Sequence, residues 1–296
     1  MSTSSEPPPP PGIIAEVGCN HRGSLETAVE MIKMAAQFCR ADVVKFQKRH
    51  PRELLSEDQY NAPHPNPVHA YGETYGEHRE YLELSTDQHR VLKEACDEWG
   101  TTYSTSVWDL TSAREIIGLE PALLKVPSAC NTHRPLLRFL ADEYGGEIHL
   151  SFGMTTRQEE ERVVHLFEQA GRAGDLVVYA CTSGYPVAFE DICLHEITRL
   201  KETFAKRVKA IGFSGHHLGI AADVAALALG ATWFERHFTL DRTWKGTDHA
   251  ASLEPDGLRR LCRDLRNVSR ALTAKGEEVL PVEAEQRKKL KVLRSD

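Results

Sequence analysis

The sequence predicts a single-domain α/β protein, a (β/α)₈ barrel. Short apolar runs alternate with stretches of helical periodicity along the 296 residues. Eight strand and helix units can be distinguished, and their strands are almost continuously apolar, as in parallel sheets that are buried on both faces. The length suits either two ordinary domains or one barrel of about 250 residues. The eight units therefore favour one barrel.

The first half of the chain shows the pattern most clearly. An apolar run at 13–17 predicts a strand, and Ser24 precedes a helical pattern that ends at Cys39. Ser is a preferred helix N-cap because its side chain accepts hydrogen bonds from free backbone amides. A second strand is expected at 42–47, and a long polar insertion follows from 50 to 80.

The same alternation continues to the end of the chain. Strands are expected at 101–106, 122–126, 147–151, 176–180, 208–213 and 231–235, and the clearest helices at 86–99, 111–118, 218–229 and 256–272. The alternative fold is a doubly wound sheet, but no Gly-x-Gly-x-x-Gly turn follows the first strand. We place the barrel at 13–275, after a disordered proline-rich segment at 1–12. A tail at 276–296 is expected to pack on the barrel.

Composition and charge argue against several classes of protein. The 36 basic and 43 acidic side chains give a net charge of −7 without blocks of like charge, so no nucleic-acid or membrane surface is expected. Apolar runs stay short of the roughly 20 residues of a bilayer span. The chain start lacks the features of a secretory signal, which favours the cytoplasm. The seven cysteines are scattered, which argues against disulfides or a thiolate zinc site.

Polar side chains recur at the carboxyl ends of all eight expected strands, where a barrel of this kind carries its chemistry. They are Glu16, Asn20 and His21; Lys45 and Gln47; Thr105; Lys125 and Ser128; Ser151; Thr182, Ser183 and Tyr185; Ser214 and His216; and Glu235 and His237. An unpaired buried charge is costly, so the Lys and Glu residues must have partners or a ligand.

Lys45 and Lys125 come from separate strands and have hydroxyl side chains on the neighbouring strands. Two cations with hydroxyl groups suit a phosphate or a phosphorylated carboxylate. The alternative is that both lysines merely pair with barrel carboxylates such as Glu16.

His216 and His237 end two neighbouring strands, so both imidazoles can reach one point above the barrel. Two neutral imidazoles suit Mn²⁺, Zn²⁺, Fe²⁺ or Co²⁺, with positions left for water and substrate. The alternatives are a structural role for the pair and the use of His217 in place of His216.

Nine short motifs resemble those of the N-acetylneuraminate (sialic acid) synthase family and keep their order over about residues 13 to 293. The first strand and its loop read IIAEVGCNHRGS at 13–24, and the family reads I-I-A-E-I-G-x-N-H-x-G. The others are VKFQ at 44–47, ST at 104–105, KVPS at 125–128, LSFGM at 150–154, CTSGYP at 181–186, GFSGH at 212–216, FERHFT at 234–239 and TDHAASL at 247–253. Each motif is weak alone, but the set is specific.

The resemblance implies that phosphoenolpyruvate condenses with a sugar aldehyde to give a 2-keto-3-deoxy sugar acid and phosphate. The residues implied for phosphoenolpyruvate are Lys45, Thr105, Lys125, Ser128, Ser151, Ser183 and Ser214. The implied catalytic residues are Glu16, Asp248, His216 and His237, and those facing the acceptor are Gln47, Tyr185, Cys130 and Asn20. The two histidines would hold a divalent metal, Mn²⁺ first, with Zn²⁺, Co²⁺ or Mg²⁺ as alternatives. Only small-molecule partners are implied, and a homo-oligomer stays open.

Departures from the family pattern point to an altered acceptor. Cys130 stands where the family carries an acidic residue, and a thiol cannot replace that carboxylate as a hydrogen-bond acceptor. Gly215 replaces an aspartate and Ser183 an asparagine. At 288–295 the chain reaches the junction to a C-terminal antifreeze-like domain, which we expect to be missing, together with its sugar-binding arginine. The insertion at 50–80 is either a surface excursion or the source of new acceptor contacts.

Two other functions stay open. The 3-deoxy-manno-octulosonate 8-phosphate synthases are also single barrels, and their metal-binding members use a cysteine near the first strand, where Cys19 lies. They act on a phosphorylated aldose. A non-catalytic sugar-binding barrel would account for Cys130 and Gly215, but not for the retained lysines and histidines.

Overall fold

The computed structural model describes residues 10–292, and within them eight parallel strands close into a barrel in chain order. The strands are β1 (Gly12–Gly18), β2 (Val43–Lys48), β3 (Thr102–Val107), β4 (Leu123–Val126), β5 (Glu147–Ser151), β6 (Leu176–Cys181), β7 (Ala210–Gly215) and β8 (Trp233–His237). β8 pairs with β1, which closes the barrel and excludes an open sheet. The predicted (β/α)₈ fold is confirmed. Positions 1–9 of the proline-rich segment expected at 1–12 lie outside the described residues.

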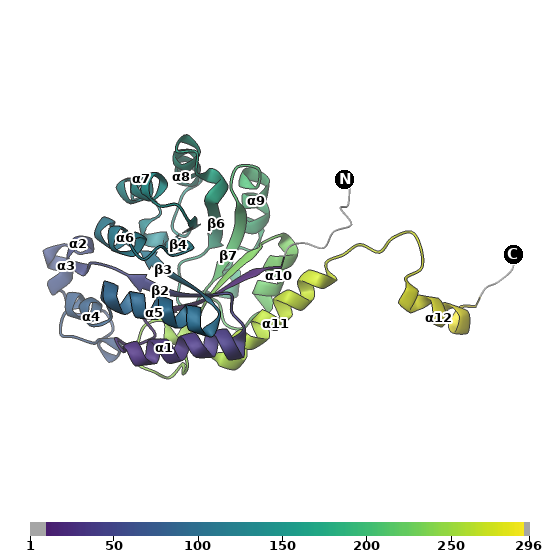
Figure 1. The fold of residues 1–296 in the computed structure, drawn as a ribbon, viewed down its shortest axis with the longest axis horizontal. Coiled ribbons are helices and arrows are strands. Elements are labelled where there is room, and N and C mark those ends of the chain that lie inside the picture. The colour runs from purple at the N-terminus through teal and green to yellow at the C-terminus, as the bar shows by residue number, and fades with distance from the viewer. Residues whose placement is uncertain (1–9, 293–296) are drawn as a thin grey trace.

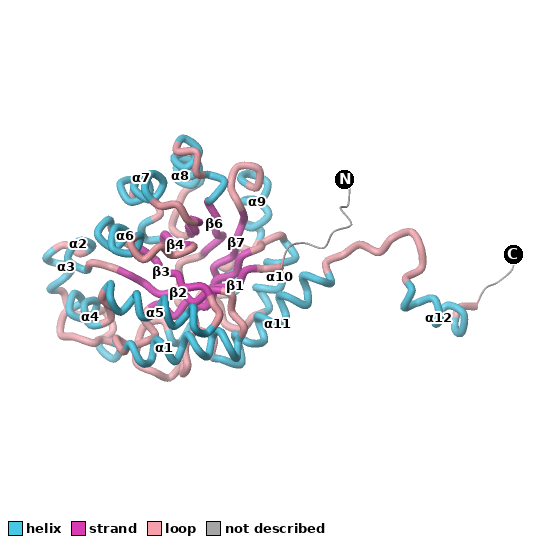
Figure 2. Tube along the Cα trace, viewed as in Figure 1, coloured by secondary structure: helices cyan, strands magenta, loops and turns pink. Residues whose placement is uncertain are grey.

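Helices surround the strands on the outside of the barrel (Figures 1 and 2). They are α1 (Leu25–Lys33) with its π-helical continuation (Met34–Cys39), α5 (Thr86–Trp99), α6 (Leu110–Ile117), α7 (Arg134–Glu143), α8 (Arg157–Gln169), α9 (His195–Phe204), α10 (Ala221–Leu229) and α11 (Pro255–Ala271). Ser24 caps α1 as predicted, since its Oγ accepts from the Thr27 amide at 3.1 Å. β7 and β8 begin two residues later than expected. Val208 and Ala231, the first residues of the expected strands, are buried but precede the strands.

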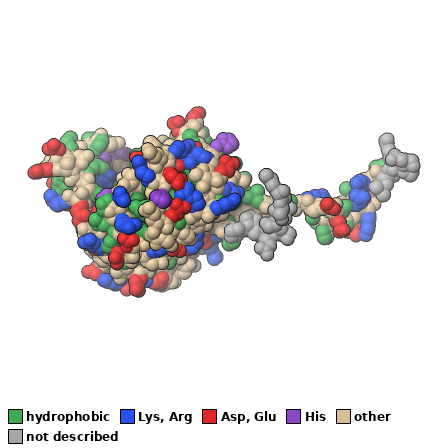
Figure 3. All heavy atoms as spheres, turned by 90° about the horizontal axis from the view of Figure 1, so that it is seen from above, with side chains coloured by type: hydrophobic (Ala, Val, Ile, Leu, Met, Phe, Trp, Pro, Cys, Tyr) green, Lys and Arg blue, Asp and Glu red, His purple; other side chains and the backbone are tan. Residues whose placement is uncertain are grey.

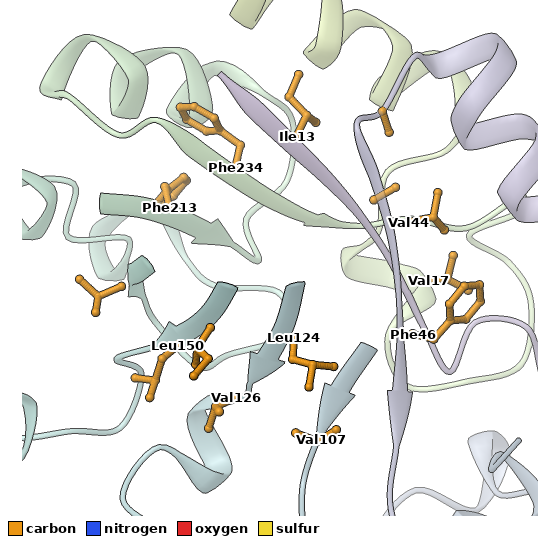
Figure 4. Packing of buried hydrophobic residues seen from close by; sticks show 14 of the residues in the cluster. Ile13, Val17, Val44, Phe46, Val107, Leu124, Val126, Leu150, Phe213 and Phe234 are labelled. Atoms are coloured by element: carbon orange, nitrogen blue, oxygen red, sulfur yellow. The ribbon is translucent and has the colours of Figure 1, made fainter. Parts of the chain in front are cut away.

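Successive side chains of each strand face opposite sides of the barrel wall. Val44 and Phe46 point outward to the helices, together with the other residues that Figure 4 labels. Val43 faces inward and packs with Ile14, Leu123 and other residues at the amino ends of the strands. The next inward positions along these strands carry charges, which form the floor of the site described below.

The insertion at 50–80 folds into short helices, α2 (Pro51–Leu54), α3 (Glu57–Asn61) and α4 (Tyr75–Tyr81), with a 3₁₀ turn at Pro67–His69. Two hydrogen bonds tie it to the loop that follows β8. Tyr71 Oη donates to the Lys245 carbonyl at 2.5 Å, and the Gly246 amide donates to His69 Nδ1 at 3.2 Å. The insertion is therefore fastened across the mouth of the barrel.

The C-terminal tail differs from the expectation that it packs on the barrel. It forms α12 (Pro281–Leu290), which stands apart from the barrel in Figure 1. Nearly all residues from 272 to 292 are exposed, including Val282 and Leu290. Polar Glu285 and Gln286 lie between these two apolar positions, so α12 has no apolar stripe to bury.

No helix within residues 10–292 is long and apolar enough to cross a membrane. Basic and acidic side chains are interspersed on the face of the barrel that Figure 3 shows.

A buried ion cluster links β8 and α10 to the loop that follows β7. Arg236 Nη1 lies 2.5 Å from Asp223 Oδ2, and His217 Nε2 lies 3.2 Å from the same oxygen. All three side chains are at most 1% exposed. Removing one partner would leave a buried charge without compensation.

We expect Asp223→Ala to lower the free energy of unfolding by about 3–5 kcal/mol, because it leaves Arg236 buried and unpaired. The matched control is Asp256→Ala. Asp256 pairs with Arg259 and Arg260, but its side chain is 53% exposed. Such a surface pair contributes less than about 1 kcal/mol. Urea unfolding measures both losses, and equal losses would contradict the assigned role of the cluster.

Candidate active site

A cavity of about 410 Å³ opens at the carboxyl ends of the strands. Its volume lies in the range of small-molecule sites, roughly 300–1,000 Å³. Each strand contributes at least one polar side chain to its lining. In strand order these are Glu16, Lys45 with Gln47, Ser106, Lys125, Ser151, Cys181, Ser214, and Glu235 with His237.

Four buried charges form the floor of this cavity. Lys45 Nζ lies 2.5 Å from Glu16 Oε2 and 3.7 Å from Glu235 Oε2. Lys125 Nζ lies 2.8 Å from the same Glu235 oxygen. The sequence left two roles open for the lysines, pairing with barrel carboxylates or binding an anionic ligand. Both lysines pair with carboxylates, and both also line the cavity, where a ligand could reach them. Each buried lysine thus has a carboxyl group as its partner inside the barrel.

The environment separates the pKa values of the two carboxyl groups. Burial raises the pKa of Glu16 from 4.5 to about 7, although the charge of Lys45 opposes this. Burial acts in the same direction on Glu235, but Lys125 and Lys45 outweigh it and hold its pKa far below the usual range. Glu16 can therefore gain or lose a proton near neutral pH, whereas Glu235 stays ionised.

The two ammonium groups differ as well. Burial acts to lower the pKa of both, yet in Lys45 the carboxylates of Glu16 and Glu235 prevail and raise it. In Lys125 burial prevails, so its pKa is lowered despite Glu235.

Serine hydroxyls from several strand ends complete the lower part of the cavity. Ser214 Oγ donates to Glu235 Oε1 at 3.2 Å, and Ser128 Oγ accepts from the Gly153 amide at 3.2 Å. A Cβ at position 153 would lie 2.4 Å from Ser183 Oγ and 2.5 Å from Ser128 Oγ. A glycine is required there because three loops meet. The predicted residues Ser128, Ser151, Ser183 and Ser214 all line the cavity.

Thr105 lies outside the cavity, which corrects its predicted position. It is the Cα partner of Phe46, on the face of β3 that points to the helices. Its neighbour Ser106 points inward, and Ser106 Oγ accepts from Lys45 Nζ at 2.8 Å. The alternation of the strand places one of two adjacent hydroxyls in the site.

Two residues predicted to face the acceptor also lie outside the cavity. Asn20 is buried, and its Nδ2 donates to the Phe238 carbonyl and to Ser252 Oγ, both at 2.9 Å. It therefore joins the loops after β1 and β8. Cys130 is buried and its Sγ donates to the Trp108 carbonyl at 3.0 Å.

The other two predicted acceptor residues, Gln47 and Tyr185, line the cavity. Gln47 Nε2 donates to Glu16 Oε1 at 3.0 Å, which fixes its amide beside the floor. The Tyr185 ring lies against His216, with 4.4 Å between the ring centroids.

His216 and His237 converge on the cavity, with ring centroids 5.4 Å apart. The Thr182 carbonyl accepts from His216 Nδ1 at 3.0 Å, so a metal would bind the other ring nitrogen. His237 Nδ1 is buried without a hydrogen-bond partner in the described part of the chain. It lies 4.0 Å from Asp248 Oδ2, and Asp248 also lines the cavity.

The protonation of the two rings differs. Burial lowers the pKa of His237 to about 4, so this ring is neutral at pH 7. Burial acts in the same way on His216, but its contact with Cys181 outweighs it and raises the pKa. The pair and the nearby carboxylate are chemically suited to a divalent metal. Within residues 10–292, however, no three His, Cys, Asp or Glu side chains form a complete ligand set.

Several lining residues are absent from the predicted set. Arg49 follows Lys45 and Gln47 at a spacing of two, so strand alternation continued past the strand end would have found it. Tyr75, His78 and Arg79 come from the insertion, where no periodic signal marks them. Their presence at the cavity supports the expectation that the insertion contributes to the site.

Comparison with known proteins gives one family and several named relatives. A family model described as the NeuB family matches residues 31–277. N-acetylneuraminate-9-phosphate synthase from Homo sapiens is 39% identical over 271 residues, which cover 92% of this chain and 74% of the human protein. N,N′-diacetyllegionaminic acid synthase from Campylobacter jejuni is 32% identical over 283 residues, which cover 95% of this chain and 82% of that protein.

A solved structure agrees with these sequence relatives. The crystal structure of N-acetylneuraminic acid (sialic acid) synthetase from Leptospira borgpetersenii, in complex with citrate, superposes with a TM-score of 0.80 at 28% identity. The match covers 95% of this chain and 92% of that one.

Proposed function

Because this chain belongs to the NeuB family, we propose that it condenses phosphoenolpyruvate with a sugar aldehyde to give a 2-keto-3-deoxy sugar acid and inorganic phosphate. One observation carries the proposal: Lys45 and Lys125 lie buried in one cavity among serine hydroxyls. The relatives, an N-acetylneuraminate-9-phosphate synthase and an N,N′-diacetyllegionaminic acid synthase, support it.

The lysines and serines suit the anionic substrate. Lys45 and Lys125 would neutralise the phosphate and carboxylate of phosphoenolpyruvate. We assign the hydroxyl contacts to Ser106, in place of Thr105, and to Ser128, Ser151, Ser183 and Ser214. Added negative charge raises the pKa of a nearby carboxyl group, so binding would favour the protonated form of Glu16.

Proton transfer fits Glu16 and Asp248. As C3 of phosphoenolpyruvate bonds to the aldehyde carbon, C2 becomes electron-poor, and a water molecule adds there. Protonated Glu16 can supply the proton that the former aldehyde oxygen gains. The water loses a proton, which the resulting Glu16 carboxylate or the ionised Asp248 can accept, since His237 holds the pKa of Asp248 below its usual value despite burial. The bond from C2 to the phosphate oxygen then breaks as the C2 hydroxyl proton passes to the departing phosphate, which releases inorganic phosphate and leaves the ketone.

We propose that His216 and His237 hold a divalent metal, Mn²⁺ first, close to Asp248. Such an ion would polarise the carbonyl oxygen of the aldehyde as a Lewis acid. Zn²⁺, Co²⁺ and Mg²⁺ stay alternatives. A cytoplasmic location and a homo-oligomeric state also stay predictions.

The test supplies phosphoenolpyruvate and Mn²⁺ with N-acetylmannosamine, its 6-phosphate or arabinose 5-phosphate. The 6-phosphate is included because phosphoenolpyruvate adds three carbons to the six of the hexose, so carbon 6 of the hexose becomes carbon 9 of a 9-phosphate product. We expect phosphate release that depends on a hexose-derived aldose. Turnover with arabinose 5-phosphate alone would favour an octulosonate-type synthase. If no aldose is used and phosphoenolpyruvate gives no thermal protection, the barrel is not this enzyme.

We expect Ser106→Ala to weaken phosphoenolpyruvate binding roughly 10- to 150-fold, because a hydrogen bond within a charged site contributes about 1.5–3 kcal/mol. Thr105→Val, one position away, is the matched control and should leave the Kd unchanged, since Thr105 points to the helices. Isothermal titration calorimetry measures both values. Equal weakening by the two variants would contradict the corrected assignment.

We expect His237→Ala to weaken Mn²⁺ binding about a hundredfold, since it removes one of two proposed ligands. His89→Gln is the control, because His89 is a buried histidine outside the cavity. Binding is followed by the electron paramagnetic resonance signal of free Mn²⁺. Unchanged affinity in His237→Ala would refute the metal assignment.

A further inference from the structure

A second cavity of about 200 Å³ adjoins the first. The two share Arg49, Arg79, Trp108 and Ala129 in their linings, so these four residues form the junction between them. The volume is below the roughly 300 Å³ at which small-molecule sites begin. The second cavity therefore suits one substituent of a ligand whose body lies in the first.

The walls beyond the junction are apolar. They consist of Pro51, Leu54 and Leu55, from α2 and the residue after it, together with Cys130. Burial raises the pKa of Cys130 to about 12, so the thiol is neutral. Its Sγ is engaged with the Trp108 carbonyl. A phosphate or carboxylate placed among these side chains would be desolvated without a partner.

The junction offers hydrogen-bond donors. Arg49 Nε lies 2.5 Å from Glu83 Oε1, which fixes the guanidinium 5.4 Å from the centroid of the Trp108 ring. Arg79 Nε donates to Tyr75 Oη at 2.9 Å, and its guanidinium lies 5.8 Å from the same ring. Each guanidinium has five N–H groups, more than these contacts use. A carbonyl oxygen at the junction can accept from them.

We propose that the acceptor sugar carries an acyl substituent longer than acetyl. Its carbonyl oxygen accepts a hydrogen bond from Arg49 or Arg79, and its alkyl chain occupies the cavity formed by Pro51, Leu54, Leu55 and Cys130. This inference rests on the proposed condensation and names the class of its acceptor. It also gives Cys130 a role, as the neutral wall of the acyl site.

The test uses N-acetyl-, N-propanoyl- and N-butanoylmannosamine. We expect kcat/KM, measured by phosphate release, and binding affinity, measured by calorimetry, to rise about three- to fourfold per added methylene group. Values that stay flat or fall from acetyl to butanoyl would overturn the acyl site.

A cavity-filling variant sharpens the test. Leu54→Trp places an indole in the second cavity without altering the lining of the first, and we expect it to abolish the rise along the series. Leu55→Trp is an independent second variant if Leu54→Trp fails to fold. Leu218→Trp is the matched control, because Leu218 is exposed after β7 and lines neither cavity. A series that keeps its rise in the filled variants would also overturn the proposal.

Failure of the acyl site and failure of the condensation give different results. Equal turnover of all three aldoses would leave the condensation standing and remove the acyl site. Affinity that rises along the series without any phosphate release would support the acyl site and contradict the condensation.

Discussion

Four charged side chains packed inside the barrel are the constraint on which the rest of the structure depends. Strand register brings them together, since Glu16 and Lys45 are Cα partners on β1 and β2. Lys125 and Glu235 meet across the barrel interior at 2.8 Å. Because a buried charge without a partner is costly, none of the four can change alone. The same contacts therefore also form the charged floor of the cavity.

Adjacent residues at the ends of β7 and β8 point to opposite sides of the barrel wall. His216 and His237 point into the cavity, whereas His217 and Arg236 point outward and form the ion cluster with Asp223. The proposed metal ligands thus lie next to the most buried charges of the outer layer. The stability of the ion cluster and the geometry of the histidine pair therefore depend on the same two short segments, 216–217 and 236–237.

Much of this arrangement follows from a period of two. Short, nearly continuous apolar runs predict the strands, and the alternation of side chains along a strand explains why Lys45 and Gln47 line the site together with Arg49. The same rule separates Ser106 from Thr105, a distinction that matching motifs one residue at a time does not make. The folding of the insertion could not be predicted, because its helices have four to seven residues and depend on contacts far along the chain. The cavity that Cys130 lines depends in turn on that folding, because Pro51, Leu54 and Leu55 of the insertion form its other apolar walls.

The hydrogen bonds from Tyr71 and Gly246 couple the insertion to the loop that carries Asp248. These segments lie about 170 residues apart in the sequence, yet they form one wall. Replacing the insertion alone with that of a relative would leave the Lys245 carbonyl and the Gly246 amide without these partners. A change of acceptor preference that alters the insertion therefore requires a matching change in the loop after β8, so the two loops are expected to evolve together.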